Sequence, residues 1–323
     1  MRSLCHRLAA LAAATVLALS AAACGSSGST PTSAPGGAAA TTDGGTFPAS
    51  ITTVIGVVHV RSRPAAIISL SPTATVLLYA IGAGHQVKAV DSDSDYPPQA
   101  PTSKLDALNP NLEAIVAYKP DLVVISNLSD NFSSLAKHLA SFSIPVLYLP
   151  APAGLSGVYS EFDQLGRATG HLGQAEREDA KLRSQISQIV ASVPKHSQPV
   201  SYYYELDQTY YSVTSSTFIG TLLALLGMKS IADTASGAAS SGGYPQLSSE
   251  YIVKANPDYV ILADTVCCHQ NAATAAARPG WSGLTGVKAG HVILLNDDIA
   301  SRWGPRIVDL LHTVATDITK GSG

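Results

Sequence analysis

The chain has 323 residues, of which 46% are apolar and 13% are charged, and its formal net charge is −3. A chain of this length can bury one large or two medium hydrophobic cores. The weakly acidic charge and the lack of a dense stripe of Lys and Arg argue against a polyanion-binding surface, so we expect no nucleic-acid partner.

The N-terminal segment predicts an export signal and a tether. Residues 1–23 have a basic head and then a run of Ala, Leu and Val, which is typical of a signal peptide and too short for a confident spanning helix. The stretch Leu19–Gly25 resembles a bacterial lipobox, with Cys24 as the diacylated mature N-terminus. An ordinary secretory peptide, cleaved after an Ala-x-Ala site, is the alternative. Residues 24–47 then predict a flexible Gly-, Ser-, Ala- and Pro-rich tether, so we expect a lipid-anchored protein on the extracytoplasmic face of the cell membrane.

Residues 48–154 predict an N-terminal α/β lobe. Residues 49–60 alternate around a glycine and predict a β-hairpin. The first helix follows a buried strand directly, with Ser71 as its N-cap and Pro72 at its first position. Short apolar strands that alternate with helices are typical of a mostly parallel sheet covered on both faces. The predicted strands are 66–70, 87–90, 122–125 and 146–149, and the predicted helices are 74–81, a short one ending before Pro120, and 132–142.

Three alternating aspartates follow the second predicted strand of this sheet, at 91, 93 and 95. They suggest calcium, but an EF-hand loop needs a Gly at its sixth position and a Glu at its twelfth. Those positions hold Tyr96 and Thr102. We therefore interpret this segment as a solvated loop at the mouth of a cleft.

One structural unit occurs twice. Residues 111–126 and 248–263 each contain a short helix with a glutamate in its first turn, then Pro-Asp, then an apolar strand. The glutamates are Glu113 and Glu250. A unit of this kind used twice predicts two α/β lobes of similar design.

The segment between the lobes predicts helices, and the remainder predicts the second lobe. Residues 155–195 carry no strand signal and have a break near Gly170. A continuous helix over 172–193 would be about 33 Å long, enough for a stiff strut that permits only a small closure of the lobes. Residues 196–323 predict the C-terminal lobe, with strands at 200–206, 259–263 and 292–295, a helix at 218–226 and a C-terminal helix.

Two adjacent cysteines, Cys267 and Cys268, lie in the second lobe. In an oxidising compartment they are either a strained vicinal disulfide or two free thiols, and the sequence leaves both open. His269 follows them, but no fourth ligand stands at a usual spacing, so we expect no metal site.

Five motifs carry a family resemblance. They are Ile68–Thr73 preceded by Arg63-Pro64, Asp95–Ala100, Asn111–Val123, Tyr244–Glu250 and Gly304–Ile307. From about Thr46 onward, the chain resembles the class III periplasmic binding proteins, the solute-binding proteins of ABC importers for iron-siderophores and cobalamin. The Tyr-Pro-Pro-Gln and Tyr-Pro-Gln pieces look most like the cobalamin-binding branch.

The resemblance implies two doubly wound α/β lobes with central, mostly parallel sheets, joined by one long helix, with a ligand cleft between them. It implies an ABC permease and its ATPase as partners of a monomer. In that family one glutamate on each lobe docks onto arginines of the permease, and Glu113 and Glu250 match those positions. The alternative is that each glutamate only stabilises the first turn of its helix through the dipole.

The predicted cleft is lined by loops at the carboxyl ends of the strands, where ligands bind in open α/β sheets. Trp281 and Tyr211 are further candidates for an aromatic wall, and ordinary core or surface packing is the alternative for each. The residues that we expect to bind ligand are Ser71, Pro72, Thr73, Asp93, Tyr96, Ser126, Asn127, Tyr210, Tyr244, His269, Arg302, Trp303 and Arg306.

The expected ligand is a bulky metal chelate: a ferric siderophore, cobalamin or haem. In the cobalamin branch, aromatic side chains of both lobes sandwich the corrin ring, and Tyr244 matches one such position, whereas Asp93 and Ala107 stand where others are aromatic. No phosphate loop, nucleophile elbow or zinc-binding helix is present, so we expect neither an enzyme nor a cofactor. The alternative is a surface lipoprotein that uses the same fold as a scaffold.

Overall fold

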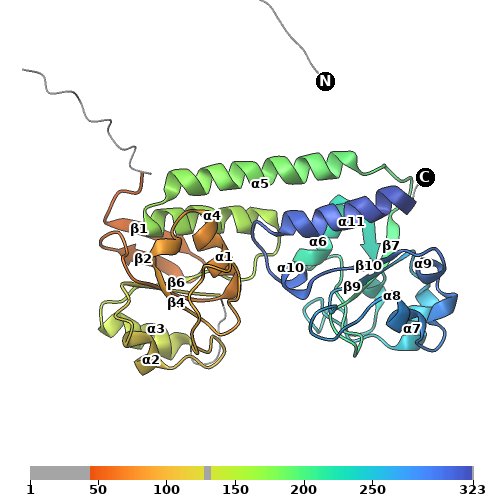
Figure 1. The fold of residues 1–323 in the computed structure, drawn as a ribbon, viewed down its shortest axis with the longest axis horizontal. Coiled ribbons are helices and arrows are strands. Elements are labelled where there is room, and N and C mark those ends of the chain that lie inside the picture. The colour runs from red at the N-terminus through yellow and green to blue at the C-terminus, as the bar shows by residue number, and fades with distance from the viewer. Residues whose placement is uncertain (1–43, 127–131, 322–323) are drawn as a thin grey trace, which may run out of the picture. The chain divides into compact units, whose positions relative to one another are not determined.

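The computed structural model describes residues 44–126 and 132–321 (Figure 1). The predicted signal peptide, Cys24, most of the predicted tether and Asn127 lie outside the described residues. Within the described ranges, no helix is long and apolar enough to cross a membrane.

The N-terminal lobe begins with the predicted hairpin, in which β1 (Ala49–Thr53) pairs antiparallel with β2 (Gly56–Val60). A four-stranded parallel sheet follows, in the order β4-β3-β5-β6. Its strands are β3 (Ile67–Leu70), β4 (Val87–Val90), β5 (Leu122–Ile125) and β6 (Val146–Tyr148). Its helices are α1 (Pro72–Ala80), the 3-10 turn Gly84–Gln86, α2 (Leu112–Val116) and α3 (Phe132–Ser141).

The C-terminal lobe repeats this design. Its four parallel strands have the order β10-β9-β7-β8, so in each sheet the first strand lies between the second and the third. The strands are β7 (Val200–Glu205), β8 (Met228–Ser230), β9 (Tyr259–Leu262) and β10 (Val292–Leu294). The helices are α6 (Phe218–Leu225), α7 (Ser249–Ala255), α8 (Ala272–Ala276), α9 (Thr285–Lys288), α10 (Asp297–Ser301) and α11 (Ile307–Gly321), with 3-10 turns at Ile231–Thr234 and Trp281–Gly283.

The repeated Pro-Asp dipeptide has the same structural role in both lobes. The Asp121 carboxylate, just before β5, accepts hydrogen bonds from the backbone N–H groups of Ala65 and Ala66, at 2.9 and 3.0 Å. Asp258, just before β9, accepts from the backbone N–H and the hydroxyl of Ser201, at 2.9 and 2.6 Å. In each lobe, therefore, the aspartate ties the start of the third strand to the start of the first. The two copies of the repeat therefore share a side-chain contact as well as a sequence pattern.

Two helices join the lobes. α4 (Leu155–Thr169) ends at Gly170, which adopts a left-handed conformation with φ of 76°, and α5 (Leu172–Ser192) follows. α5 packs on α4 and on α11 (Figure 1). The predicted break and the predicted long helix are both present.

The hydrophobic core has three parts, because the side chains of each strand alternate between the two faces of its sheet. On β5, Leu122 and Val124 face a large core that also contains Ile186 of α5 and Leu311 of α11, while Val123 faces a smaller core under α2 and α3. A third core covers the opposite face of the C-terminal sheet. The large core runs through both lobes and the helices between them.

Candidate ligand cleft and docking sites

The carboxyl end of the N-terminal sheet is lined by hydroxyl groups. Ser71, after β3, caps α1 by accepting from the Ala74 backbone N–H at 3.2 Å. Ser126, after β5, donates its hydroxyl hydrogen to the Ser71 hydroxyl, with the two oxygens 2.6 Å apart. These two residues flank the point where the strand order reverses, which is where ligands bind in open α/β sheets.

A second chain of hydroxyls lies beneath the aspartate loop. The Thr75 hydroxyl is 2.9 Å from the Ser69 hydroxyl and 3.0 Å from that of Ser94, which donates to Asp91 at 2.7 Å. Burial raises the pKa of Asp91, against the lowering effect of the Ser94 bond. Asp91 thus holds the loop together from inside, while Asp93 is exposed.

The carboxyl end of the C-terminal sheet carries buried charge instead. Glu205, the last residue of β7, is fully buried and forms a bidentate ion pair with Arg278, at 2.5 and 2.6 Å. Tyr203 donates its hydroxyl hydrogen to the same carboxylate at 3.0 Å. Asp264, directly after β9, is also fully buried, and neither of its carboxyl oxygens has a hydrogen-bond partner among the described residues. Burial and the neighbouring Glu205 charge raise the pKa of Asp264 to about 7.

The segment between α10 and α11 reaches from the C-terminal lobe to the N-terminal lobe. Arg302 forms an ion pair with Asp95 at 2.8 Å and donates to the backbone carbonyl of Asp93 at 3.1 Å. The Arg302 hydrogen bond lowers the pKa of Asp95. Arg302 also pairs with Asp298 at 2.7 Å. A predicted ligand-binding cation is therefore already engaged across the two lobes.

Arg306 makes a second contact between the lobes. Its guanidinium carbon lies 4.3 Å from the centre of the Tyr96 ring, a cation–π contact. The Nη1 atom of Arg306 is buried and has no hydrogen-bond partner in the described part of the chain. Arg306 and Tyr96 line a cavity of about 390 Å³ together with Val76 and Tyr79 of α1. The structure thus brings two more of the predicted ligand-binding residues together.

A cavity of about 270 Å³ lies where the loop after β6 approaches the C-terminal lobe. Tyr244, Arg302 and Trp303 line it, together with residues 151–153 and the start of α6. The Tyr244 side chain has 40% of its surface exposed. The cavity combines aromatic and apolar surface with the guanidinium of Arg302, which is paired with Asp95 and Asp298. We regard this cavity and the hydroxyl-lined edge as the candidate cleft.

The other predicted ligand residues are placed differently. Trp281 is fully buried in the core of the C-terminal lobe, where its ring meets Tyr203 edge-on and the guanidinium of Arg278 lies 4.5 Å above it. Tyr210 packs beside Trp281 in the same core. Of the two alternatives for Trp281, aromatic wall or core packing, the structure holds the second, because the indole fills the core of its own lobe. Pro72 and Thr73 start α1 next to Ser71, while Tyr211 and His269 are exposed.

Cys267 and Cys268 are free thiols in the structure. Of the two alternatives that the sequence left open, a vicinal disulfide or free thiols, the structure has the free thiols. Their loop is fixed from α10, because Asp297 accepts from the backbone N–H groups of Val266 and Cys267, at 3.0 and 2.7 Å. Burial is the largest of several influences that raise the pKa of the Cys267 thiol, which keeps it protonated at neutral pH.

Glu113 and Glu250 occupy equivalent positions. Each is exposed and is the second residue of its helix. The N-cap side chain of that helix, Asn111 or Ser248, accepts a hydrogen bond from the backbone N–H of the residue directly after the glutamate. A backbone N–H and the Ser248 hydroxyl lower the pKa of Glu250. In both lobes the helix that carries the glutamate leads through Pro-Asp into the third strand of the sheet. The repeat therefore presents two matched, exposed carboxylates, one in each lobe.

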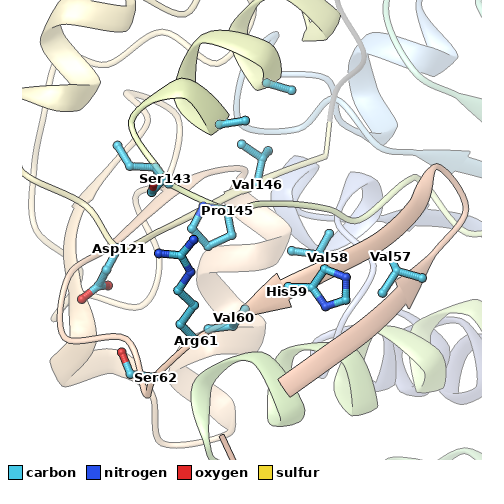
Figure 2. Close-up of a pocket in the computed structure, with 13 residues that line it drawn as sticks. Val57, Val58, His59, Val60, Arg61, Ser62, Asp121, Ser143, Pro145 and Val146 are labelled. Carbon is cyan, nitrogen blue, oxygen red and sulfur yellow. The ribbon is translucent and has the colours of Figure 1, made fainter. Parts of the chain in front are cut away.

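A cavity of about 520 Å³ lies at the opposite edge of the N-terminal sheet (Figure 2). Asp121 and Pro145, which precede β5 and β6, line it together with residues 57–62 of the hairpin and its end. Figure 2 shows Arg61 lying between Asp121 and Pro145. Ligands of open α/β sheets bind at the carboxyl edge, so we do not assign the ligand to this cavity.

Comparison with known proteins identifies the family. The family model described as periplasmic binding protein matches residues 67–299. This chain belongs to that family. It is 31% identical over 266 residues to the vitamin B12-binding protein of Pectobacterium atrosepticum, covering 80% of this chain and 89% of that protein. It is 29% identical over 267 residues to an uncharacterized ABC transporter substrate-binding lipoprotein of Bacillus subtilis, covering 81% and 82%.

Solved structures agree with the fold. A possible iron-binding, periplasmic solute-binding protein of Staphylococcus epidermidis is 27% identical, with a TM-score of 0.68, and covers 80% of this chain and 99% of its own. The periplasmic vitamin B12 binding protein of Vibrio cholerae is 23% identical, with a TM-score of 0.67, over 80% and 98%. The predicted fold class and the predicted family are therefore confirmed, and the family and these relatives are binding proteins.

The sequence alone did not reveal the buried groups around the cleft. Glu205, Asp264 and Arg278 come from separate segments, and no local pattern joins them. Glu161 is different, because it interrupts the apolar face of α4 between Val158 and Leu165. A carboxylate on a buried helix face is a signal that the sequence carries.

Proposed function

We propose that this protein is the extracytoplasmic solute-binding component of an ABC importer and that it captures a bulky metal chelate. The observation that carries this proposal is the match to substrate-binding relatives over four fifths of the chain, which includes both lobes. Cobalamin, haem and ferric siderophores are the chelates that we consider. No chemical step is involved, since capture and release need only binding and a change in how the lobes engage the ligand.

The candidate cleft supports a chelate with a flat or apolar body. Tyr244 and Trp303 offer aromatic surface in the cavity beside α6, and Arg302, which is paired with Asp95 and Asp298, lies at its edge. Hydroxyls of Ser71 and Ser126 offer neutral hydrogen-bonding groups at the sheet edge. Aromatic faces contribute contact area, while a few polar groups fix the orientation of the ligand.

The delivery step involves Glu113 and Glu250 and the membrane. We propose that a monomer docks these two carboxylates onto arginines of the permease, whose ATPase drives transport, through charge-assisted hydrogen bonds. A lipid on Cys24 keeps the protein near the permease. The equivalent, exposed positions of the two glutamates support this assignment.

The ligand is tested by titrating the protein with cyanocobalamin, haemin and a ferric hydroxamate while recording tryptophan fluorescence. The chain contains two tryptophans, and only Trp303 lines the candidate cavity. We expect saturable quenching by at least one chelate, most of which is lost in Trp303→Phe. Calorimetric titration of the same chelates checks the affinity independently. Absence of binding across all three would overturn the proposal and favour a scaffold role.

Docking is tested separately with Glu113→Lys and Glu250→Lys, alone and together. We expect unchanged chelate binding in solution and loss of uptake by cells that carry the cognate importer. Asp309→Lys is the matched control, because Asp309 is also exposed in the first turn of a helix, α11. Uptake that survives the double reversal would show that these glutamates only stabilise their helices.

A further inference from the structure

Glu161 is a carboxylic acid buried between the linking helices and the segment before α11. It lies on α4 with 3% of its surface exposed. Its hydrogen-bond partner is the indole N–H of Trp303, which donates to Oε2 over 2.8 Å. The two residues are 142 positions apart in the chain, and the contact joins the linking helix α4 to the segment that enters the last helix of the C-terminal lobe.

The ring of Trp303 is part of the candidate cleft. It lines the cavity of about 270 Å³ beside Tyr244 and Arg302, and it also packs against the large core that both lobes share. An indole can be fixed by its single N–H, which is a donor only and needs an acceptor when it is buried. Glu161 supplies that acceptor, so its state decides how the aromatic wall of the cavity is held.

We propose that Glu161 is the positioning residue for Trp303, and that protonation of this carboxyl group couples the cleft wall to pH. In the uncharged acid, Oε2 accepts the indole N–H and nothing charged is buried. Loss of the proton leaves a carboxylate in an apolar site with one donor, which favours exposing it to water and moving the indole with it. Chelate capture should therefore be tightest while Glu161 is protonated.

Among the described residues, Glu161 forms no ion pair that would offset its charge. Burial is the dominant influence on its pKa and raises it to about 8, and the Trp303 bond works weakly in the other direction. Four arginines on the elements packed around it have interactions of their own: Arg302 with Asp95 and Asp298, Arg306 with Tyr96, Arg183 with Asp179, and Arg167 with Asp163. The other titratable groups on those elements are Tyr159 of α4, Glu176, Arg177, Glu178 and Lys181 of α5, His171 just before α5, Tyr79 of α1, His59 of the hairpin, Asp297 of α10, and Asp309, His312, Asp317 and Lys320 of α11.

The first test needs no ligand. With two tryptophans, the wild-type protein gives two indole N–H signals in a nitrogen-15 NMR spectrum, and Trp303→Phe assigns them. We expect the Trp303 signal to move with pH between 6 and 10, with a midpoint near 8, and to become insensitive to pH in Glu161→Gln. Asp163→Asn is the matched control on the same helix, and it should leave the midpoint unchanged. A Trp303 signal that does not titrate, or that titrates equally in Glu161→Gln, would overturn the proposal.

The second test rests on the proposed function and measures affinity for whichever of cyanocobalamin, haemin or the ferric hydroxamate binds. Glu161→Gln keeps an acceptor for the indole and should bind within twofold of wild type at pH 6.5, without the loss of affinity that wild type shows at pH 9. Glu161→Leu removes the acceptor and should bind at least fivefold more weakly at both pH values. Equal affinities for wild type, Gln and Leu would refute the role in capture. Failure of all three chelates would count against the proposed function and leave the NMR result standing.

Discussion

At the carboxyl end of the N-terminal sheet, the polar groups near the strand reversal are the hydroxyls of Ser71 and Ser126. At the corresponding end of the C-terminal sheet they are a buried Glu205–Arg278 ion pair and the buried acid Asp264. The two sheets have the same strand order and the same Pro-Asp tie. The shared topology therefore fixes where polar side chains gather, and the side chains themselves decide whether that edge is neutral or charged.

This difference has an energetic consequence. A hydroxyl pair loses little when one member is removed, since the net contribution of a neutral hydrogen bond is about 1 kcal/mol. A buried ion pair is not strong evidence of stability, but breaking it leaves an uncompensated charge, which costs about 3–5 kcal/mol. We therefore expect the two edges to respond very differently to substitution.

The largest effect is expected for Arg278→Met. Among the described residues it leaves the buried Glu205 carboxylate with the Tyr203 hydroxyl as its one side-chain donor, so the free energy of unfolding should fall by about 3–5 kcal/mol. Urea denaturation followed by circular dichroism measures it. Arg167→Met, which breaks an exposed pair with Asp163, is the control and should stay within about 1 kcal/mol of wild type. A loss below 1 kcal/mol for Arg278→Met would remove the contrast between the lobes.

A pH-dependent effect is expected at Asp264. Its pKa is raised in the folded state, to about 7, so the folded protein binds more protons than the unfolded chain between about pH 4 and 7. Stability from this group is therefore greatest at low pH and is lost as the pH rises toward 7. Asp264→Asn should abolish that loss, making the variant more stable than wild type at pH 8 but not at pH 4. Melting temperatures of wild type and Asp264→Asn, measured from pH 4 to pH 8, test this. The same dependence of melting temperature on pH in the two proteins would contradict the prediction.

The smallest effects are expected at the hydroxyl edge. Ser126→Ala removes one neutral hydrogen bond and should cost about 1 kcal/mol or less. Ser71→Ala removes that bond and the cap of α1, so it should cost more, up to about 2 kcal/mol. Chemical denaturation of both variants tests the order. If Ser126→Ala lowered the free energy of unfolding as much as Arg278→Met, the expected difference between the two sheet edges would be contradicted.

Local signals made much of the fold predictable. The N-cap Ser71, the break at Gly170 and the apolar runs at 122–125 and 259–262 each act over a few neighbouring residues, and each lies where it was expected. The strand Met228–Ser230 was missed because it is three residues long and has an exposed lysine at its centre, so it shows no apolar run. The short helices α8, α9 and α10 were missed because each is only four or five residues long, too short to show a helical pattern.

The site was less predictable because its contacts join distant segments. Arg302 and Arg306 were expected to bind ligand, and the structure pairs them with Asp95 and with the Tyr96 ring. Trp281 was an equal candidate with Trp303 for an aromatic wall, yet one indole fills a core and the other lines a cavity. The sequence offers the same kind of evidence for both tryptophans, so only their packing in the structure shows which of them lines the cavity.

The sequence by itself determined the two lobes, the Ser71 cap of the first helix, the matched glutamates and the family, because each depends on short patterns or on motifs read in order. Only the tertiary structure decided which polar groups meet: Ser126 with Ser71, Arg278 with Glu205, and Trp303 with Glu161. Such contacts depend on how sheets and helices pack around a shared core, and burial then sets the cost of charge at each one. That is why two lobes with one topology carry different chemistry.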